Sequence, residues 1–244
     1  MTKRTLERRF WKISDELREK GEFEEAIIEY KELVVDAEKE GFYDPHQQIA
    51  VTYGLLEKYD QAEKWFKKTL NLARKAKDYR TYGNTLRDFA TLFTRLKKYD
   101  EAVGYFEKSI ESLCKTTDFK GIIASIDKLG VCFSYLRDYK KAKEHVISAI
   151  TLVKYCKDRD SEYFYHLFLY DLAKVLFNEG NFQEALVYAK ESFDGCSRLE
   201  HLHRAQKAQE LITDINKAVD NNLPSVKLTR RKLLLKKPED KIGS

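Results

Sequence analysis

The chain has 244 residues, of which 43% are hydrophobic, 35% charged and 13% aromatic, with a formal net charge of +5 at pH 7. This aromatic content is too high for a disordered chain, and no apolar run approaches the roughly 18 to 20 residues that span a bilayer. Only three prolines and ten glycines are present, so few residues would interrupt a helix. The opening segment, MTKRTLERRFWKISDEL, lacks the apolar centre of a signal peptide, and we expect a cytoplasmic protein.

One short motif recurs five times along the chain: an aromatic residue, two further residues, then an alanine. The alanines are separated by 36, 40, 40 and 43 residues. A regular period in this range is the signature of a solenoid. The pairs are Phe23 with Ala26, Tyr59 with Ala62, Tyr99 with Ala102, Tyr139 with Ala142, and Phe182 with Ala185.

Each period predicts a helical hairpin. In the second period Ala62, Phe66 and Leu70 recur at i, i+4 and i+8, and a similar apolar stripe precedes them. We expect Asp60 and Asp100 at the start of the second helices, where an acidic group suits both the N-cap and the helix dipole. Twelve positions before each repeated alanine stands a small residue, which would let the two helices approach closely. These residues are Ser14, Ala50, Ala90, Gly130 and Ala173.

This arrangement resembles the tetratricopeptide repeat, whose first helix carries W-x-x-L-G-x-x-Y and whose second carries A-x-x-x-F. The period near 40 is longer than the usual 34, and in this it resembles kinesin light chains and bacterial peptide-pheromone receptors. The resemblance implies an all-α, right-handed solenoid of five hairpins. The matching second-helix pairs are Ala26 with Tyr30, Ala62 with Phe66, and Ala102 with Phe106, decaying to Ala142 with Val146 and Ala185 with Ala189.

The predicted solenoid covers residues 3–222, with repeats at about 6–41, 42–78, 79–117, 118–158 and 159–198. An apolar stripe over residues 199–222 predicts a helix that closes the stack against water. Residues 223–244 carry seven Lys or Arg against two acidic residues, and we expect a flexible basic tail. The tail could also bind a partner, an acidic membrane surface or the protein itself. Its candidate residues are Lys227, Arg230, Arg231, Lys232, Lys236 and Lys237.

The sequence contains none of the common catalytic motifs, such as a phosphate-binding loop, a nucleophile elbow or a zinc-binding H-E-x-x-H. The four cysteines lack C-x-x-C spacing, and we expect them to be reduced core residues. We therefore predict a protein that is not an enzyme and that has no cofactor and no metal site.

By the resemblance, the first helices of the hairpins line a concave groove that binds partners. Asn84 would offer a donor and an acceptor to a peptide, and Arg87 with Arg95 would hold an acidic group. Repeat two offers Gln47, Val51 and Leu55. The full set of predicted groove residues is Asn84, Arg87, Thr91, Arg95, Asp127, Tyr135, Tyr170, Lys174, Phe177 and Asn178.

The function indicated by the sequence is a non-catalytic scaffold or adaptor that binds a protein or peptide, with an acidic segment as one candidate ligand. Two alternatives remain at this stage. The chain could be a peptide-sensing regulator that acts on a separate output protein. It could also bind nucleic acid or an anionic membrane through its basic tail, although the aromatic residues at core positions leave few rings for stacking on bases.

Overall fold

The computed structural model describes residues 2–18, 20–156 and 160–221, and within these residues it contains helices and no strand. The chain divides into two compact units, residues 1–156 and 157–244. The division falls close to the boundary predicted between the fourth and fifth repeats. The predicted tail residues, 223–244, lie outside the described part of the chain.

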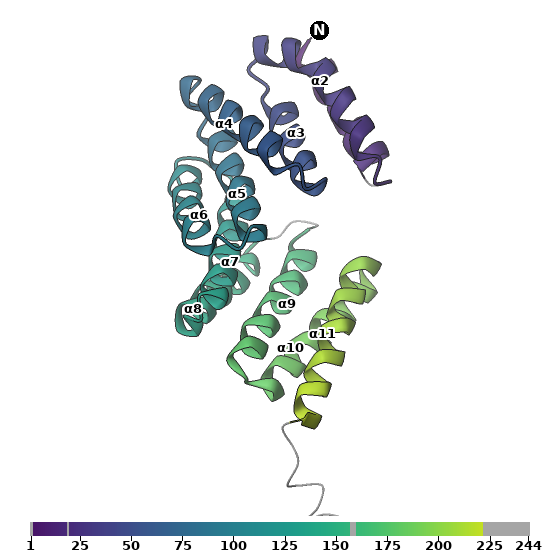
Figure 1. Ribbon diagram of the computed structural model, residues 1–244, viewed down its shortest axis with the longest axis vertical. Helices are drawn as coiled ribbons and strands as arrows, with labels where there is room; N and C mark the ends of the chain where they lie inside the picture. The colour runs from purple at the N-terminus through teal and green to yellow at the C-terminus, as the bar shows by residue number, and fades with distance from the viewer. Residues whose placement is uncertain (1, 19, 157–159, 222–244) are drawn as a thin grey trace, which may run out of the picture. The chain divides into compact units, whose positions relative to one another are not determined.

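The first unit is a row of consecutive helices, each packed against the next (Figure 1). First helices of neighbouring hairpins also touch, since α3 contacts α5 and α5 contacts α7. The helices are α1 (Lys3–Ile13) with the π-helical turn η1 (Ser14–Arg18), α2 (Phe23–Lys39), α3 (Asp44–Leu55), α4 (Tyr59–Lys75), α5 (Tyr79–Arg95), α6 (Tyr99–Leu113), α7 (Phe119–Tyr135) and α8 (Tyr139–Val153).

The second unit has three described helices: α9 (Ser161–Glu179), α10 (Phe182–Arg198) and α11 (Leu202–Asn221). Helix α9 pairs with α10, and α11 packs on α10 with a lesser contact to α9. The prediction of an all-α solenoid of helical hairpins is confirmed. The number of repeats and the right-handed twist stay predictions.

The repeated alanines and the small residues opposite them form the contacts that close each hairpin. One core cluster in the first unit contains Ala50, Ala62 and Phe66 of the second hairpin, with Phe89 and Leu92 of the third. The next cluster repeats this composition one hairpin later. A single hairpin therefore buries its apolar face only when its neighbour is present. The members of that next cluster are Ala90, Ala102, Phe106, Leu129 and Cys132.

Gly130 occupies the small-residue position of the fourth hairpin, where the backbone of α8 lies close to α7. A Cβ on Gly130 would lie 2.7 Å from Cγ2 of Val146 and 2.9 Å from the carbonyl oxygen of Ala142. Both distances are shorter than side chains tolerate. Glycine at this position is therefore a packing requirement of the α7–α8 contact.

The turn inside each hairpin uses a residue with positive φ, five positions before the repeated alanine. These residues are Gly21, Glu57, Lys97, Arg137 and Gly180, with φ between 57° and 92°. The amide that follows each left-handed residue bonds back to the first helix, as in a Schellman motif. Only two of the five are glycines, so composition alone does not reveal this repeated turn.

The predicted position of Asp60 and Asp100 at the start of the second helices is confirmed, but the predicted N-cap role is wrong. The N-cap residues of α4 and α6 are Lys58 and Lys98, neither of which makes a side-chain capping bond. Asp60 and Asp100 lie in the first turn of their helices. An acidic group there still interacts favourably with the helix dipole.

Side-chain caps are found instead at three aspartates that the sequence reasoning passed over. Asp78 begins α5, Asp118 begins α7 and Asp138 begins α8. Each carboxylate accepts a hydrogen bond from the backbone N–H three residues later. Two of these caps hold first helices, which carry the predicted groove.

In the second unit, α11 buries Ala205, Ala208, Ile212 and Ile215, as the predicted closing helix requires. Leu202 falls within the apolar stripe predicted over residues 199–222, but 76% of its surface is exposed. It is the first residue of α11, and the apolar contact begins one turn later.

Cysteine burial follows the prediction at two positions out of four. Cys132 and Cys196 are buried in the helical core, whereas Cys114 is exposed and Cys156 is half-buried. Burial raises the pKa of the Cys132 and Cys196 thiols, so these two side chains are uncharged, poorly reactive core residues.

Candidate functional site

A groove runs between the first helices α3 and α5, and we call it the α3–α5 groove. It has a volume of about 80 Å³, enough for one small side chain. Its apolar part comes from the faces of α3 and α5 and from the Phe66 ring beneath them. The lining residues are Val51, Gly54, Leu55, Phe66, Asp88, Thr91, Leu92 and Arg95.

The groove contains Thr91 and Arg95 of the predicted set, together with Val51 and Leu55 of repeat two. Arg95 is exposed at the end of α5, and no described residue pairs with its guanidinium. The Thr91 hydroxyl donates to the carbonyl oxygen of Arg87, 3.0 Å away on the preceding turn. Arg95 is therefore the cation of this groove that is available to an incoming group.

Arg87 has a different environment, although it was predicted to act together with Arg95. Its Nε and Nη2 atoms lie 3.3 and 3.2 Å from Oδ1 of Asp88, and 24% of the Arg87 side chain is exposed. The other carboxylate oxygen of Asp88 accepts a 2.7 Å hydrogen bond from Nε2 of Gln47 on α3. These contacts join α3 to α5 through polar side chains.

The same network continues from α5 to α7. Nη1 of Arg87 donates to Oδ1 of Asn84 at 2.6 Å, and Nδ2 of Asn84 donates to Oδ2 of Asp118 at 2.8 Å. Nε of Arg80 lies 3.4 Å from the same Asp118 oxygen. We call this chain of contacts, from Gln47 to Asp118, the first-helix network. Asn84 and Arg87 stabilise neighbouring hairpins in it, so they are not free to hold a ligand.

The Asp118 carboxylate has two tasks, since it also caps α7 through the Gly121 N–H at 2.9 Å. Burial alone would raise the pKa of Asp118. The hydrogen bonds from Asn84 and Gly121, together with the charge of Arg80, outweigh burial and lower this pKa below its usual value. Asp118 is therefore a charged anchor of the network at neutral pH.

The two other predicted residues of the first unit lie on α7. Asp127 is wholly buried, with Oδ2 2.8 Å from Nζ of Lys128. Its expected exposure is contradicted, because this position of α7 faces the neighbouring helices. Tyr135 is 39% exposed, and its ring stacks on that of Tyr99 with centroids 4.7 Å apart. That stacking fixes the Tyr135 ring at the turn of the fourth hairpin.

The remaining predicted residues lie on α9, in the second unit. Nζ of Lys174 lies 5.7 Å from the centre of the Tyr170 ring, a cation–π contact. The Phe177 ring packs near Phe182 of the next helix at 5.7 Å, and Asn178 is exposed. These four residues form a surface of their own unit. The predicted tail residues Lys227, Arg230, Arg231, Lys232, Lys236 and Lys237 lie outside the described residues.

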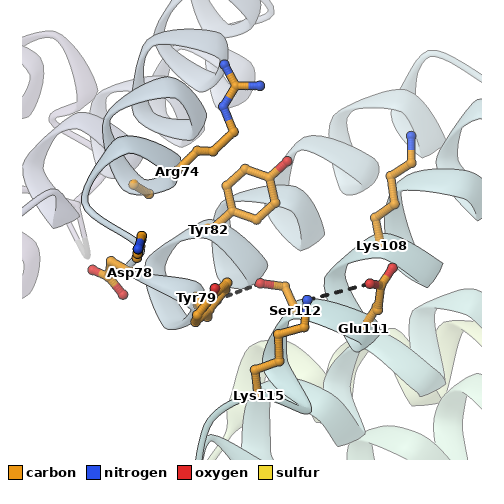
Figure 2. Close-up of a pocket in the computed structure, with 10 residues that line it drawn as sticks. Arg74, Asp78, Tyr79, Tyr82, Lys108, Glu111, Ser112 and Lys115 are labelled. Atoms are coloured by element: carbon orange, nitrogen blue, oxygen red, sulfur yellow. Dashed lines mark hydrogen bonds and ion pairs between the residues drawn. The ribbon is translucent and has the colours of Figure 1, made fainter.

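A second and larger cavity lies where the ends of α4 and α6 meet the start of α5, and sequence reasoning missed it (Figure 2). We call it the α4–α6 pocket. Its volume is about 330 Å³. The only indication of this pocket in the sequence is a group of basic residues at the ends of hairpins, a pattern that is also typical of ordinary solvated surface. The lining residues are Ala73, Arg74, Lys77, Asp78, Tyr79, Tyr82, Lys108, Glu111, Ser112 and Lys115.

Within the described ranges, no group of three or more His, Cys, Asp or Glu side chains is placed to hold a metal ion. None of the helices described is both long enough and apolar enough to cross a membrane.

Two segments of the chain match family models described as tetratricopeptide repeat, residues 45–115 and residues 168–190. The first match includes both helices of the hairpins that form the α3–α5 groove. No curated protein sequence matches the chain at a significant level.

Three solved structures illustrate the likeness of fold. A STAND protein with a tetratricopeptide repeat sensor, PH0952 from Pyrococcus horikoshii, is 20% identical over 80% of this chain, with a TM-score of 0.65. A putative kinesin light chain with TPR-like repeats from Podosopora anserina is 14% identical over 80% of this chain and 96% of its own, with a TM-score of 0.60. NprR in complex with its cognate peptide NprX is 18% identical over 88% of this chain, with a TM-score of 0.62.

The chain spans 30% of the length of the Pyrococcus protein chain and 64% of the NprR chain. At these identities the likeness shows the fold alone.

Proposed function

Because the chain is a tetratricopeptide-repeat protein, we propose that it is a non-catalytic scaffold or adaptor that binds a protein or peptide along its first helices. The observation that carries this proposal is the α3–α5 groove, where an apolar lining lies beside an arginine without a partner among the described residues. Groove-binding modules commonly combine apolar contact area with a few oriented polar groups.

The ligand that fits the groove is an extended segment with an apolar side chain and a nearby acidic group. Val51, Leu55 and Leu92 would contact the apolar side chain, and a volume of about 80 Å³ limits its size. A carboxylate would pair with Arg95, whose guanidinium can donate two parallel hydrogen bonds. Arg87 is not part of this site, because Asp88 and Asn84 already occupy its donors.

Structural relatives support a peptide as the class of ligand. NprR was crystallised with its cognate peptide NprX, and NprR shares this fold over 88% of the present chain. A second candidate function is a peptide sensor that regulates a separate output protein. It is favoured by the likeness to NprR, a protein of this fold whose structure contains its cognate peptide.

Peptide selection on the intact chain tests the proposal. A random peptide display library is selected on the wild-type protein, and the affinities of synthetic copies of the enriched peptides are measured by fluorescence anisotropy. We expect enriched peptides to carry an acidic residue close to an apolar one. Arg95→Glu is expected to weaken their binding about tenfold or more, since it replaces a charge-assisted bond with repulsion.

The matched control is Lys64→Glu, an equal charge reversal at an exposed position of α4 outside the groove. Its affinity should stay near that of the wild type. Equal weakening by both variants would contradict binding in the groove. Deleting residues 223–244 distinguishes groove binding from binding through the basic tail. A scaffold that binds in its groove keeps its peptide affinity after the deletion, whereas a protein that binds through its tail loses it.

A further inference from the structure

The α4–α6 pocket is held by the turns and caps of its three helices. Helix α4 ends in a turn at Lys77, which has a φ of 55°. Helix α5 then begins at its cap, Asp78, whose carboxylate accepts from the Thr81 N–H. The Ser112 hydroxyl on α6 donates to the carbonyl oxygen of Tyr79 at 2.9 Å, which ties the end of α6 to the start of α5. The walls of the pocket are therefore held by hydrogen bonds between side chains and the backbone.

The charges of the pocket do not balance. Of its two carboxylates, Asp78 serves as the α5 cap and Glu111 lies 3.6 Å from Nζ of Lys115. Arg74, Lys77 and Lys108 have no carboxylate partner among the described residues. Nη2 of Arg74 donates to the neutral side chain of Asn71 at 3.4 Å, and Nζ of Lys108 lies 5.7 Å from the Tyr105 ring.

Helix dipoles account for only part of this cluster. Arg74 lies in the last turn of α4, where a cation stabilises the helix by about 0.3–1 kcal/mol. Lys77 follows the end of the same helix. Lys108 lies in the body of α6, Tyr99–Leu113, ahead of its last turn, so the dipole of that helix does not call for it. The helix dipole therefore does not explain the positive charge that Lys108 adds to the pocket.

Tyr79 and Tyr82 give the pocket flat aromatic surface, and the Tyr82 hydroxyl adds a hydrogen-bond donor. Tyr79 is 44% exposed and Tyr82 is half-buried, and both rings line the cavity. Figure 2 shows the Tyr82 hydroxyl on the side of the pocket where Arg74 and Lys108 also end. No described residue hydrogen-bonds with that hydroxyl. Three helices therefore supply hydrogen-bond donors to the pocket beside the tyrosine rings: Arg74 from α4, Tyr82 from α5 and Lys108 from α6.

We propose that the α4–α6 pocket binds a phosphate monoester carried on a flat ring. A carboxylate would neutralise one of the three cations, whereas a phosphate monoester carries roughly 1.5 to 2 negative charges at neutral pH and has three acceptor oxygens. The ring of such a ligand packs against Tyr79 and Tyr82. The volume of about 330 Å³ falls at the lower end of small-ligand sites. No residue of this site belongs to the α3–α5 groove, so the two sites are independent.

Calorimetric titration of the intact chain at physiological salt tests this site with phenyl phosphate, adenosine monophosphate and inorganic phosphate. We expect both ring-bearing phosphates to bind more tightly than inorganic phosphate. The double variant Arg74→Gln, Lys108→Gln should weaken their binding by about tenfold or more, since it removes two charge-assisted contacts. Tyr82→Phe, which keeps the ring, should weaken it severalfold.

Lys75→Gln is the control, because Lys75 at the end of α4 is exposed and does not line the cavity, although it directly follows the lining residue Arg74. It should bind like the wild type. Absence of binding by every phosphate probe would overturn the proposal, as would equal losses in Lys75→Gln or equal affinities for phenyl and inorganic phosphate. These results leave the peptide affinity of the α3–α5 groove unaffected, so failure of one proposal is distinguishable from failure of the other.

A phosphotyrosine peptide and its unphosphorylated copy identify the source of the ligand. If the site serves phosphorylated proteins, the phosphopeptide binds more tightly than adenosine monophosphate and the unphosphorylated copy does not bind. If it serves free nucleotides or related small molecules, adenosine monophosphate binds more tightly. Either ranking supports the proposed chemistry, whereas equal binding of the two peptide forms contradicts it.

Discussion

Arg87 and Arg95 lie eight residues apart on α5, and their surroundings differ completely. Arg87 is enclosed by Asp88 and Asn84 in the first-helix network, which runs from α3 to the start of α7. Arg95 lies exposed at the end of the helix, beside the α3–α5 groove. The same residue type at helical spacing therefore has a structural role in one region and is available for binding in the other.

This comparison shows that the availability of a charge depends on its partners: those of Arg87 lie on α5 itself and are bonded in turn to neighbouring hairpins. Asp118, the cap of α7, provides the carboxylate that completes the network around Asn84. No described carboxylate of a neighbouring hairpin reaches Arg95 or the cations of the α4–α6 pocket in this way. Substitutions that break the enclosed contacts should therefore change stability, and substitutions at the open positions should change binding.

The largest expected effect is at the packing contact that sets the register of α5 and α6. Ala102→Leu inserts three carbons at a position with no exposed surface, and overpacking should lower the free energy of unfolding by about 1 to 3 kcal/mol. Gly104→Ala on the same helix is the control, since its added Cβ meets no atom within 4 Å. It should raise stability by up to about 1 kcal/mol. Chemical denaturation measures both; an unchanged midpoint for Ala102→Leu would contradict the register.

The second effect concerns the anchor of the network. Asp118→Ala removes the α7 cap and leaves the Asn84 amide without its acceptor, so we expect a loss of about 2 kcal/mol. Asp138→Ala removes the more exposed cap of α8, which has no such network, and should cost less. Thermal and urea unfolding of the two variants measure the difference. Equal losses would show that the contact with Asn84 adds nothing to the cap.

The direct comparison of the two arginines predicts a smaller effect. Arg87→Ala should cost about 1 kcal/mol of stability, because it removes hydrogen bonds to Asp88 and Asn84. Arg95→Ala should change stability by less than about 0.5 kcal/mol, as is usual for exposed positions. Urea denaturation of both variants is the measurement. A stability loss at Arg95 as large as that at Arg87 would remove the distinction between the two regions.

Buried histidines make the stability of the fold depend gradually on pH. The His46 side chain is wholly buried, with Nε2 2.8 Å from Oε1 of Glu38, which also pairs with Lys68. Burial lowers the pKa of His46 and outweighs the hydrogen bond to Glu38, which raises it. The folded state therefore binds a proton less readily than the unfolded state.

The stability that neutral His46 provides is present above the unfolded-state pKa of about 6.5 and is lost as the pH falls below that value toward the folded-state pKa. Burial lowers the pKa of His145 and His166 as well, so their contributions have the same sign. We expect the melting temperature to fall between pH 7.5 and 5.5, and to fall less steeply in His46→Gln. Parallel curves for the two proteins would show that His46 does not contribute.

Much of the fold could be predicted because it depends on local periodicity. The repeated alanines, the small residues opposite them and the closing helix are visible as spacings in the sequence, and the core clusters are built from them. The left-handed turn residues Glu57, Lys97 and Arg137 could not be recognised, since their side chains are unremarkable for a surface. Their conformation follows from the hairpin geometry.

The site was less predictable than the fold, because the polar network around Arg87 extends across hairpins that are distant in the sequence. Sequence spacing placed Arg87 and Arg95 on one face of α5, but it did not show that Asp118, 31 positions after Arg87, closes the network around Asn84. It also placed Asp127 on an exposed face, whereas that side chain is buried. The α4–α6 pocket combines three helices, and none of them alone has a recognisable motif.

Hydrogen–deuterium exchange of the intact chain, with and without a library-selected peptide, shows whether peptides bind in the α3–α5 groove. We expect slower exchange on binding in residues 51–55 and 88–95, which contain the α3 and α5 lining of the α3–α5 groove, and no change in residues 73–82 and 108–115 around the α4–α6 pocket. Protection confined to the α4–α6 pocket or to α9, with the groove unchanged, would contradict the assignment of peptide binding to the open end of α5.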